Sequence, residues 1–584
     1  MFLKIHLNRF LTCAFLLLVI SIWVFSPASS RGELSAPQSP RIFDLRIKIL
    51  FLGFDRNLID IDYMKWLLPS YDVRSDFRVN FTFTYTFQFS PDSLTRSFAN
   101  YLRSIEEREK RNNPFLDKDT ANYFYDANSV EGWLYSNRGS YGDLPQDGYA
   151  AIVANLKDLP TPHYYRVRYR DIDLGGEFGA SNRNYWMVGW GGHHRFYYID
   201  MSAGPHEGSY QHQPLWRFSL GGTAYDAIWL TTYLSQVIEE IVWNLFAPEA
   251  LYTPPLSDRY QIVIFVLDDD TEVDLARTLN EGAVRRAFEE LVPYAAWEIK
   301  TTFASLRRYP ELRQVFQNSF DAEDKAYALQ SVRSYIEGHL SEFIRGSPGI
   351  VVLPAFAFVL SQNRGMGPLE KWKVRPIAGQ APGKAIYAFL SVTTTKSDGI
   401  GFTQTIIHEL GHLMGLRHPH QYGASGTFVA SAMSYTQNEY IFSIFNKDFV
   451  ARTQADILMA ELESKIQELE GTLLLRKASP SVRGILDEVR HTYGKSLQAY
   501  GSMDYSSAVQ EAKNALDKAK KALQETKNLT TLAEELDRLS NEVVVWRLLT
   551  IGLMAGLISL IVLTVYLWRR APIVRAVQSV PPRR

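Results

Sequence analysis

The stretch His408-Glu409-Leu410-Gly411-His412-Leu413-Met414-Gly415-Leu416-Arg417-His418 decides the interpretation of this 584-residue chain. On a helix, His408 and His412 are four residues apart and project from one face. Gly415 accepts a positive φ without a Cβ penalty, so it predicts a sharp turn that brings His418 back to the pair. Three imidazoles leave one coordination position open, which is typical of catalytic zinc. The probability that a chain of this composition contains such a pattern by chance is on the order of 10⁻⁵.

The sequence continues with Ser431-Ala432-Met433-Ser434-Tyr435. Together the two stretches resemble the zinc signature and the Met-turn of the metzincin metalloproteases, most closely the serralysin branch, with astacins next. The resemblance covers residues 408–435. It implies that one zinc ion is bound and that the site residues have the following roles: His408, His412 and His418 as metal ligands, Glu409 as general base, Met433 as a hydrophobic floor, and Tyr435 as a second donor to the oxyanion.

The resemblance also implies an α+β fold with a zincin-like catalytic domain, a mixed sheet and an active-site helix. The implied activity is zinc-dependent endopeptidase action on a protein or peptide substrate, in which zinc-activated water attacks the carbonyl and Glu409 takes its proton. No glycine- and aspartate-rich calcium repeats follow the site. Ca²⁺ has one weak candidate site, Asp268-Asp269-Asp270, for which a solvated turn or a helix cap is the commoner explanation.

Each end of the chain combines an apolar run with flanking basic residues. Phe10 to Phe25 is an apolar run behind Lys4 and Arg9, and small residues follow it, which predicts a secretory signal peptide, with an uncleaved anchor as the alternative. Leu548 to Trp568 is a second apolar run, 21 residues without a charge, and Arg569-Arg570 follow. Its length predicts a transmembrane helix.

Charge predicts the orientation in the membrane. The arginine-rich tail, residues 569–584, should stay cytoplasmic, which leaves the zinc site extracellular on a single-pass protein of the cell membrane. The formal net charge is −1, without the clustered basic excess of nucleic-acid-binding proteins, so that class is excluded. Cys13 is the single cysteine, so a cleaved chain has no disulfide, and stability depends on core packing.

Between the ends, alternation and apolar runs predict mixed helices and strands. Strands are expected at 77–87, 260–267, 349–360 and 385–395, and helices at 226–246, 281–308 and 322–345. The neighbourhood of 385–395 is also a candidate for the sheet edge that would bind a peptide as an added strand, although the pattern does not assign the edge strand itself.

Three stripes with heptad-type spacing follow residue 453. They begin at Leu462, Ala508 and Leu532, and they predict two or three long helices that lead into the membrane. An intramolecular bundle acting as a spacer is favoured over an oligomerising stalk because Pro480 and Gly501 interrupt the pattern. A homo-oligomer through this stalk, or through Gly552 and Gly556 in the span, remains open.

The sequence therefore predicts six segments: 1–30 signal peptide, 31–255 strand-rich N-terminal domain whose role is open, 256–452 zinc protease domain, 453–546 helical stalk, 547–568 transmembrane helix, and 569–584 cytoplasmic tail. Two alternatives to the protease are a non-enzymatic surface protein with a structural or vestigial zinc site and a zinc hydrolase of non-peptide amides. Loop histidines are the preferred explanation of His193, His194, His206 and His212, over a second metal site. His420 is expected at the rim of the cleft.

Overall fold

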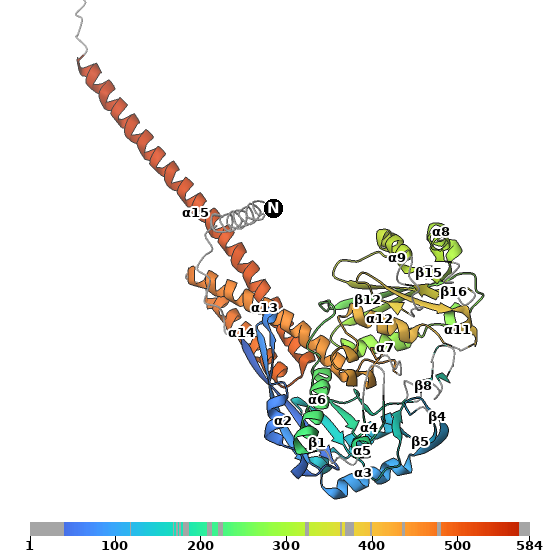
Figure 1. The fold of residues 1–584 in the computed structure, drawn as a ribbon. Helices are drawn as coiled ribbons and strands as arrows, with labels where there is room; N and C mark the ends of the chain where they lie inside the picture. Colours follow the sequence, from blue (N-terminus) through green and yellow to red (C-terminus); the bar gives the residue numbers. More distant parts are fainter. Residues whose placement is uncertain are drawn as a thin grey trace, which may run out of the picture.

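The computed structural model describes residues 40–570 except 117, 168, 171–172, 174–176, 179–185, 207–212, 220–225, 322–325, 362–364, 368–378, 398–399, 435–438 and 476–479. The predicted signal peptide and residues 571–584 lie outside this range. The fold is a mixture of helices and strands, as predicted. Figure 1 shows two lobes, each built on a sheet, a helical bundle beside the first lobe, and one helix that extends far beyond the body.

The first sheet has six strands in the order β10-β11-β6-β1-β3-β2. Its strands are β1 (Arg41–Leu52), β2 (Tyr71–Arg74), β3 (Val79–Phe89), β6 (Gly148–Ala154), β10 (Gly189–Gly191) and β11 (Phe196–Asp200). The prediction of a strand at 77–87 is confirmed by β3. The central strand β1 is parallel to both β3 and β6. Because such strands are covered on both faces, β6 is buried along its whole length.

Five helices accompany this sheet: α2 (Ile61–Leu67), α3 (Asp92–Ser104), α4 (Ala127–Ser136), α5 (Leu215–Ser219) and α6 (Ala227–Phe246). The helix predicted at 226–246 is confirmed by α6. Smaller sheets add β4 (Glu107–Asn113), β5 (Lys118–Asp126) and β7 (His163–Arg166) in one group, and β8 (Tyr169–Arg170) with β9 (Glu177–Phe178) in another.

The second sheet has the order β13-β12-β16-β19-β18. Its strands are β12 (Arg259–Asp268), β13 (Ala296–Ser305), β16 (Val351–Leu360), β18 (Gly379–Gln380) and β19 (Ile386–Ser391). Alternate residues of β12 enter different cores: Ile264 lies on one side and Phe265 on the other. The sheet is therefore covered on both faces, which explains the continuous apolar run of β12.

Helices α7 (Glu281–Leu291) and α12 (Thr403–Leu413) contribute to the core on one face of this sheet. Helices α8 (Pro310–Asn318) and α9 (Leu329–Gly338) contribute to the core on the other face. The remaining elements are α10 (Leu340–Phe343), α11 (Val392–Ser397), β14 (Phe320–Asp321), β15 (Ala326–Ala328) and β17 (Gly365–Gly367). The strands predicted at 260–267 and 349–360 are confirmed.

One prediction for this sheet is wrong. The helix expected over 281–308 ends at Leu291, and Ala296–Ser305 is strand β13, paired in parallel with β12. The strand expected over 385–395 is confirmed in part, because β19 ends at Ser391 and Val392–Ser397 is helix α11. Strand β19 lies between β16 and β18, so β18, antiparallel to β19, forms the edge among the described strands.

The bundle consists of α13 (Ile444–Leu475), α14 (Pro480–Gly501) and α15 (Tyr505–Arg570). The alanine stripe that begins at Ala508 is buried in the same core as the first sheet. Arg74 of β2 forms an ion pair with Asp456 of α13, and the Tyr500 hydroxyl of α14 donates to Asp456 at 2.6 Å. The bundle is therefore joined to the first lobe by both apolar packing and buried charge.

One described helical stretch, Glu534–Val565 of α15, is long and apolar enough to cross a membrane, and none of its most apolar part is buried in the protein. Membrane anchoring through α15 is thus possible by length and composition.

Candidate metal centre

The helix α12 presents two histidines from a segment in which nearly every residue is buried. Its apolar side chains, among them Ile406, Ile407 and Leu410, are completely buried in the core beside the second sheet. That packing fixes the rotation of the helix. His408 and His412, four residues apart, therefore project from one face, as their spacing predicted.

A glycine turn brings the third histidine back. Gly415 has φ +84°, and a Cβ at this position would lie 2.3 Å from the carbonyl oxygen of Tyr252. The Leu416 N–H donates to the Gly411 carbonyl at 3.1 Å, which closes the end of α12. The chain then runs back along the helix, and His418 reaches the first two histidines.

The three rings converge through their Nε2 atoms. Nε2 of His418 lies 3.1 Å from Nε2 of His408 and 3.2 Å from Nε2 of His412. In the part of the chain that the structure describes, this is the one group of three or more metal-type ligands whose ligand atoms all lie within 4.8 Å of one another. A tetrahedral zinc ion at about 2.1 Å from each nitrogen would hold such atoms about 3.4 Å apart.

Hydrogen bonds fix which ring nitrogens carry protons. Nδ1 of His408 lies 2.7 Å from the Ala432 carbonyl oxygen, and Nδ1 of His412 lies 2.8 Å from that of Leu416. A carbonyl oxygen only accepts, so both Nδ1 atoms are the donors, and both Nε2 atoms have lone pairs. A proton on Nε2 of His418 can form a hydrogen bond to only one of these two Nε2 atoms at a time. The arrangement fits a cation at the point where the three nitrogens meet.

The surroundings keep the imidazoles neutral. Burial, followed by the charge of His412, lowers the pKa of His408 to about 3. Burial and the neighbouring histidines lower the pKa of His418 to about 2, and burial also lowers the pKa of His412. Neutral imidazole is the form that binds a metal.

Glu409 lies beside this cluster and is buried. Burial raises the pKa of its carboxyl group to about 8. Its side chain lies against Gly379 of the edge strand β18, because a Cβ at Gly379 would be 2.5 Å from Glu409 Oε1. The carboxylate therefore lies between the histidine helix and the edge of the second sheet.

Met433 packs beneath α12. It is fully buried, and a Cβ on Gly411 would lie 2.4 Å from its Sδ, so only a glycine lets the helix approach the sulfur this closely. The preceding residue, Ala432, supplies the carbonyl that orients His408 and also accepts from Gln404 Nε2 at 3.2 Å. Tyr435, the predicted second donor, lies outside the described residues.

Sequence reasoning missed Asp173. Its carboxylate accepts the backbone N–H of Thr403 at 3.0 Å and also accepts the Thr403 hydroxyl. Thr403 is the first residue of α12, and Phe402 at the cap position makes no side-chain bond. Asp173 is 230 residues away in the sequence, and no local motif marks it.

The other sequence candidates do not form a second cluster among the described residues. His193 binds Glu131 at 2.8 Å, whereas His194 stacks on Tyr135 at 3.6 Å between ring centroids. His206 packs against Phe115 and Phe428, and His212 lies outside the described residues. His420 stacks on His418 with ring centroids 5.2 Å apart.

The three aspartates after β12 have protein partners. Asp268 accepts from the Thr271 N–H at 3.0 Å, and Asp269 accepts from the Tyr327 hydroxyl at 3.0 Å. Asp270 forms ion pairs with Arg307 and Arg313. These carboxylates therefore serve a turn and surface ion pairs, and their contacts do not support a Ca²⁺ site.

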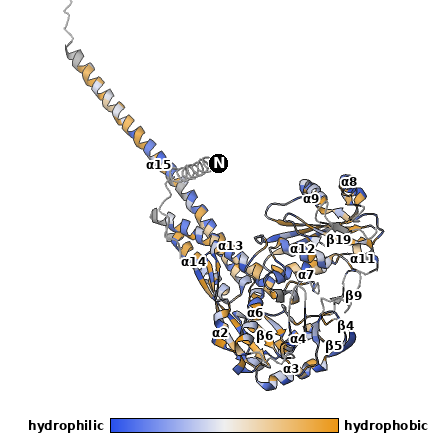
Figure 2. Ribbon diagram, viewed as in Figure 1, coloured by the Kyte–Doolittle hydropathy of each residue, from blue (hydrophilic) through white to orange (hydrophobic). Residues whose placement is uncertain are grey.

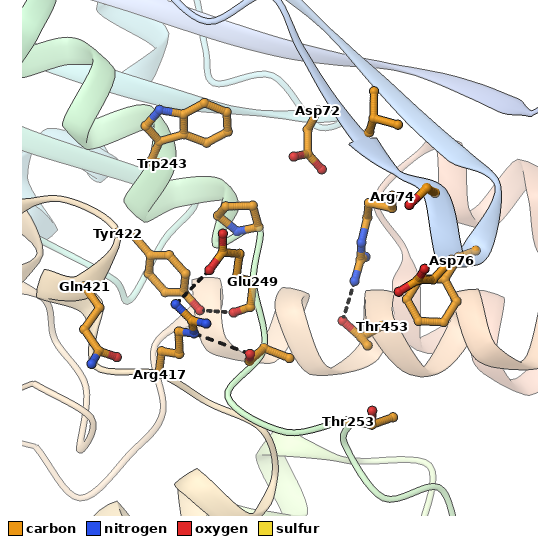
Figure 3. Close-up of a pocket in the computed structure, with 15 residues that line it drawn as sticks. Asp72, Arg74, Asp76, Trp243, Glu249, Thr253, Arg417, Gln421, Tyr422 and Thr453 are labelled. Carbon is orange, nitrogen blue, oxygen red and sulfur yellow. Dashed lines mark hydrogen bonds and ion pairs between the residues drawn. The ribbon is translucent and has the colours of Figure 1, made fainter. Parts of the chain in front are cut away.

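A polar cavity of about 710 Å³ lies behind the loop that carries His418. It lies between β2 and this loop, and Figure 3 shows Arg417 directed toward Glu249 and Tyr422 beside them. Arg417 pairs with Glu249 at 2.7 Å, and the Tyr422 hydroxyl donates to the Glu249 carbonyl at 2.5 Å. None of the three clustered histidines lines the cavity, so its charged walls support the loop from the far side.

Comparison with models of protein families and with curated proteins finds no match to this chain.

Proposed function

We propose that the protein is a zinc-dependent endopeptidase anchored in the cell membrane by α15. The observation that carries this proposal is the convergence of three histidine Nε2 atoms beside the buried carboxyl group of Glu409, which lies on the same helix as His408 and His412. The resemblance of residues 408–418 and 431–435 to metzincin signatures supports the same function. A purely structural site would need neither Glu409 nor Tyr435.

His408, His412 and His418 would hold the metal, and bound Zn²⁺ supplies Lewis acidity and charge stabilisation. Glu409 takes a proton from the attacking water and passes it to the leaving amine. The hydrogen bonds to Ala432 and Leu416 hold two of the imidazoles in the required tautomer. Tyr435 is proposed as a second donor to the developing oxyanion.

The edge strand β18 supports a peptide as the substrate. One side of β18 pairs with β19, and no other described strand pairs with its other side. An extended peptide added along that side would pass Glu409, which lies against Gly379 of β18. The basic residues after Trp568 favour an orientation with this site outside the cell.

The test compares the full chain with Glu409→Gln in detergent micelles, using an unfolded protein as substrate. The substitution keeps the shape of the side chain but removes the base, so turnover should fall about 10²–10⁴-fold while one zinc per chain is retained. The control is His420→Gln, which changes a ring that stacks on His418 and is not a ligand in the cluster.

A chelator should stop cleavage by the unchanged protein, and added zinc should restore it. Full activity of Glu409→Gln would remove Glu409 from the mechanism. A zinc-loaded, folded chain that cleaves no protein would instead identify a non-enzymatic surface protein.

A further inference from the structure

Beyond the bundle, α15 continues as an exposed helix that has an apolar stripe along one face. The alanine stripe from Ala508 to Ala522 and Leu523 are buried in the bundle, but beyond Lys527 the described side chains are exposed. Figure 2 shows hydrophilic and hydrophobic residues alternating on this part of α15, before its more uniformly hydrophobic segment. The stripe consists of residues that are 50–69% exposed: Leu532, Leu536, Leu539, Val543 and Trp546.

The spacing of this stripe is that of a coiled coil. Steps of four and three residues place Leu536 and Val543 at the a positions and Leu532, Leu539 and Trp546 at the d positions of successive heptads. Charged residues from Glu534 to Arg547 lie among the stripe, whereas the 21 residues from Leu548 carry no charge, so under the proposed anchoring the membrane span begins at Leu548 and the stripe lies in water. Five large apolar side chains on one face of a charged helix are costly to leave in water, so the face indicates a partner.

The flanking charges select a second copy of the same helix in parallel orientation. In a parallel pair, a residue at g faces the following e position of the partner, so Glu542 meets Arg547 in two symmetric pairs. Glu535 at the preceding g position meets the neutral Ser540. An antiparallel pair would instead bring glutamates toward glutamates. Val543 at a with Leu539 at d favours two strands.

We propose that residues 532–546 form a parallel two-stranded coiled coil between two copies of this chain. Two heptads alone make a marginal coil. The bilayer offsets this because it holds both chains in the same surface and orientation, which raises their effective concentration. The dimer places two bodies side by side on one membrane and leaves the buried alanine stripe of each bundle unchanged.

Cysteine cross-linking in the full, membrane-embedded chain tests the proposal. Cys13 is the single native cysteine, so Cys13→Ser gives a background without thiols. Leu539→Cys at a d position should give a disulfide-linked dimer under mild oxidation, since facing d residues lie within disulfide reach. Asn541→Cys, on the opposite face of the same helix, is the matched control and should stay monomeric. Equal cross-linking at both positions, no cross-linking at either, or a product with another protein would overturn the proposal.

Charge reversal tests the register independently. Glu542→Arg alone and Arg547→Glu alone each place like charges at the interface, and each should lower the cross-linked fraction about threefold. The double reversal restores opposite charges and should restore the cross-linked fraction. Failure of the double variant to recover, where both single variants are impaired, would contradict the parallel pairing.

Discussion

The carboxylate of Asp173 caps the helix that carries His408 and His412 by accepting the N–H of Thr403 at 3.0 Å. The same Thr403 hydroxyl accepts the Asn280 N–H at 2.7 Å, so one residue joins three distant segments. A residue from the region before α6 therefore completes the N-terminus of α12. Because it satisfies a backbone donor there, the N-terminal part of the chain is expected to be a permanent support of this helix.

Replacing Asp173 with Asn should destabilise the protein by about 1 kcal/mol, because a charged cap at the helix N-terminus is lost. Loss of the cap should also displace the N-terminal end of α12, and this displacement should weaken zinc binding, measured by competition with a chelator. The matched control is Asp226→Asn, which removes the cap of α6, where Asp226 accepts the Trp229 N–H at 2.7 Å. That control should show a similar loss of stability with unchanged zinc affinity. Equal zinc affinities for all three proteins would contradict the role of Asp173.

Metal binding should stabilise the fold through the three histidines. A ligand at one hundred times its dissociation constant stabilises a protein by about 2.7 kcal/mol, so zinc should raise the melting temperature of the chelator-treated chain. His418→Ala should abolish that increase, because two ligands remain. His420→Ala should preserve it. An unchanged response of His418→Ala would show that the zinc binds elsewhere.

The histidine cluster was predictable because its information is local. The interval of four residues on a helix and a glycine that permits φ +84° lie within eleven residues. The apolar run of β12 was predictable for the same reason, since both faces of that strand are covered. Its neighbour β13 was not, because it lies at the end of the sheet order and has polar residues such as Glu298 and Lys300 in place of a buried run.

The sequence pattern also did not predict long-range polar contacts. Nothing near Asp173 distinguishes it from other surface acids, since its role depends on a backbone N–H 230 residues away. The same holds for His193. Its neighbours in sequence predicted a loop histidine but not its partner, and its ring binds the almost fully buried Glu131. Local periodicity therefore specifies elements and the metal motif, but not the side chains that hold them together.

The stability contribution of His193 should depend on pH. Burial lowers its pKa, but the hydrogen bond to Glu131 and the charges of Glu131 and Glu439 outweigh burial, so the pKa is raised from 6.5. A histidine with a raised pKa in the folded state stabilises fully below its unfolded value and loses this contribution as pH rises through the folded value. The destabilisation caused by His193→Gln should therefore be larger near pH 6, on the order of 1 kcal/mol, and smaller near pH 9. Unfolding by urea at both pH values measures this difference, and a larger cost at the higher pH would contradict the sign.

The attachment of the bundle should depend on the buried pair of Arg74 and Asp456. Asp456 is fully buried, and Arg74 also donates to Thr453 at 3.1 Å, so the pair joins β2 to α13. Asp456→Asn should destabilise the protein by about 3–5 kcal/mol because it leaves a guanidinium buried without its closest countercharge. Replacing both partners, Arg74→Met with Asp456→Leu, removes both charges and should recover most of that loss, since buried pairs often contribute little beyond apolar residues of similar volume. Chemical unfolding of the two variants beside the unchanged chain distinguishes these outcomes. If the double variant were less stable than Asp456→Asn, the hydrogen bonds from Tyr500 and to Thr453, rather than charge compensation, would dominate the junction.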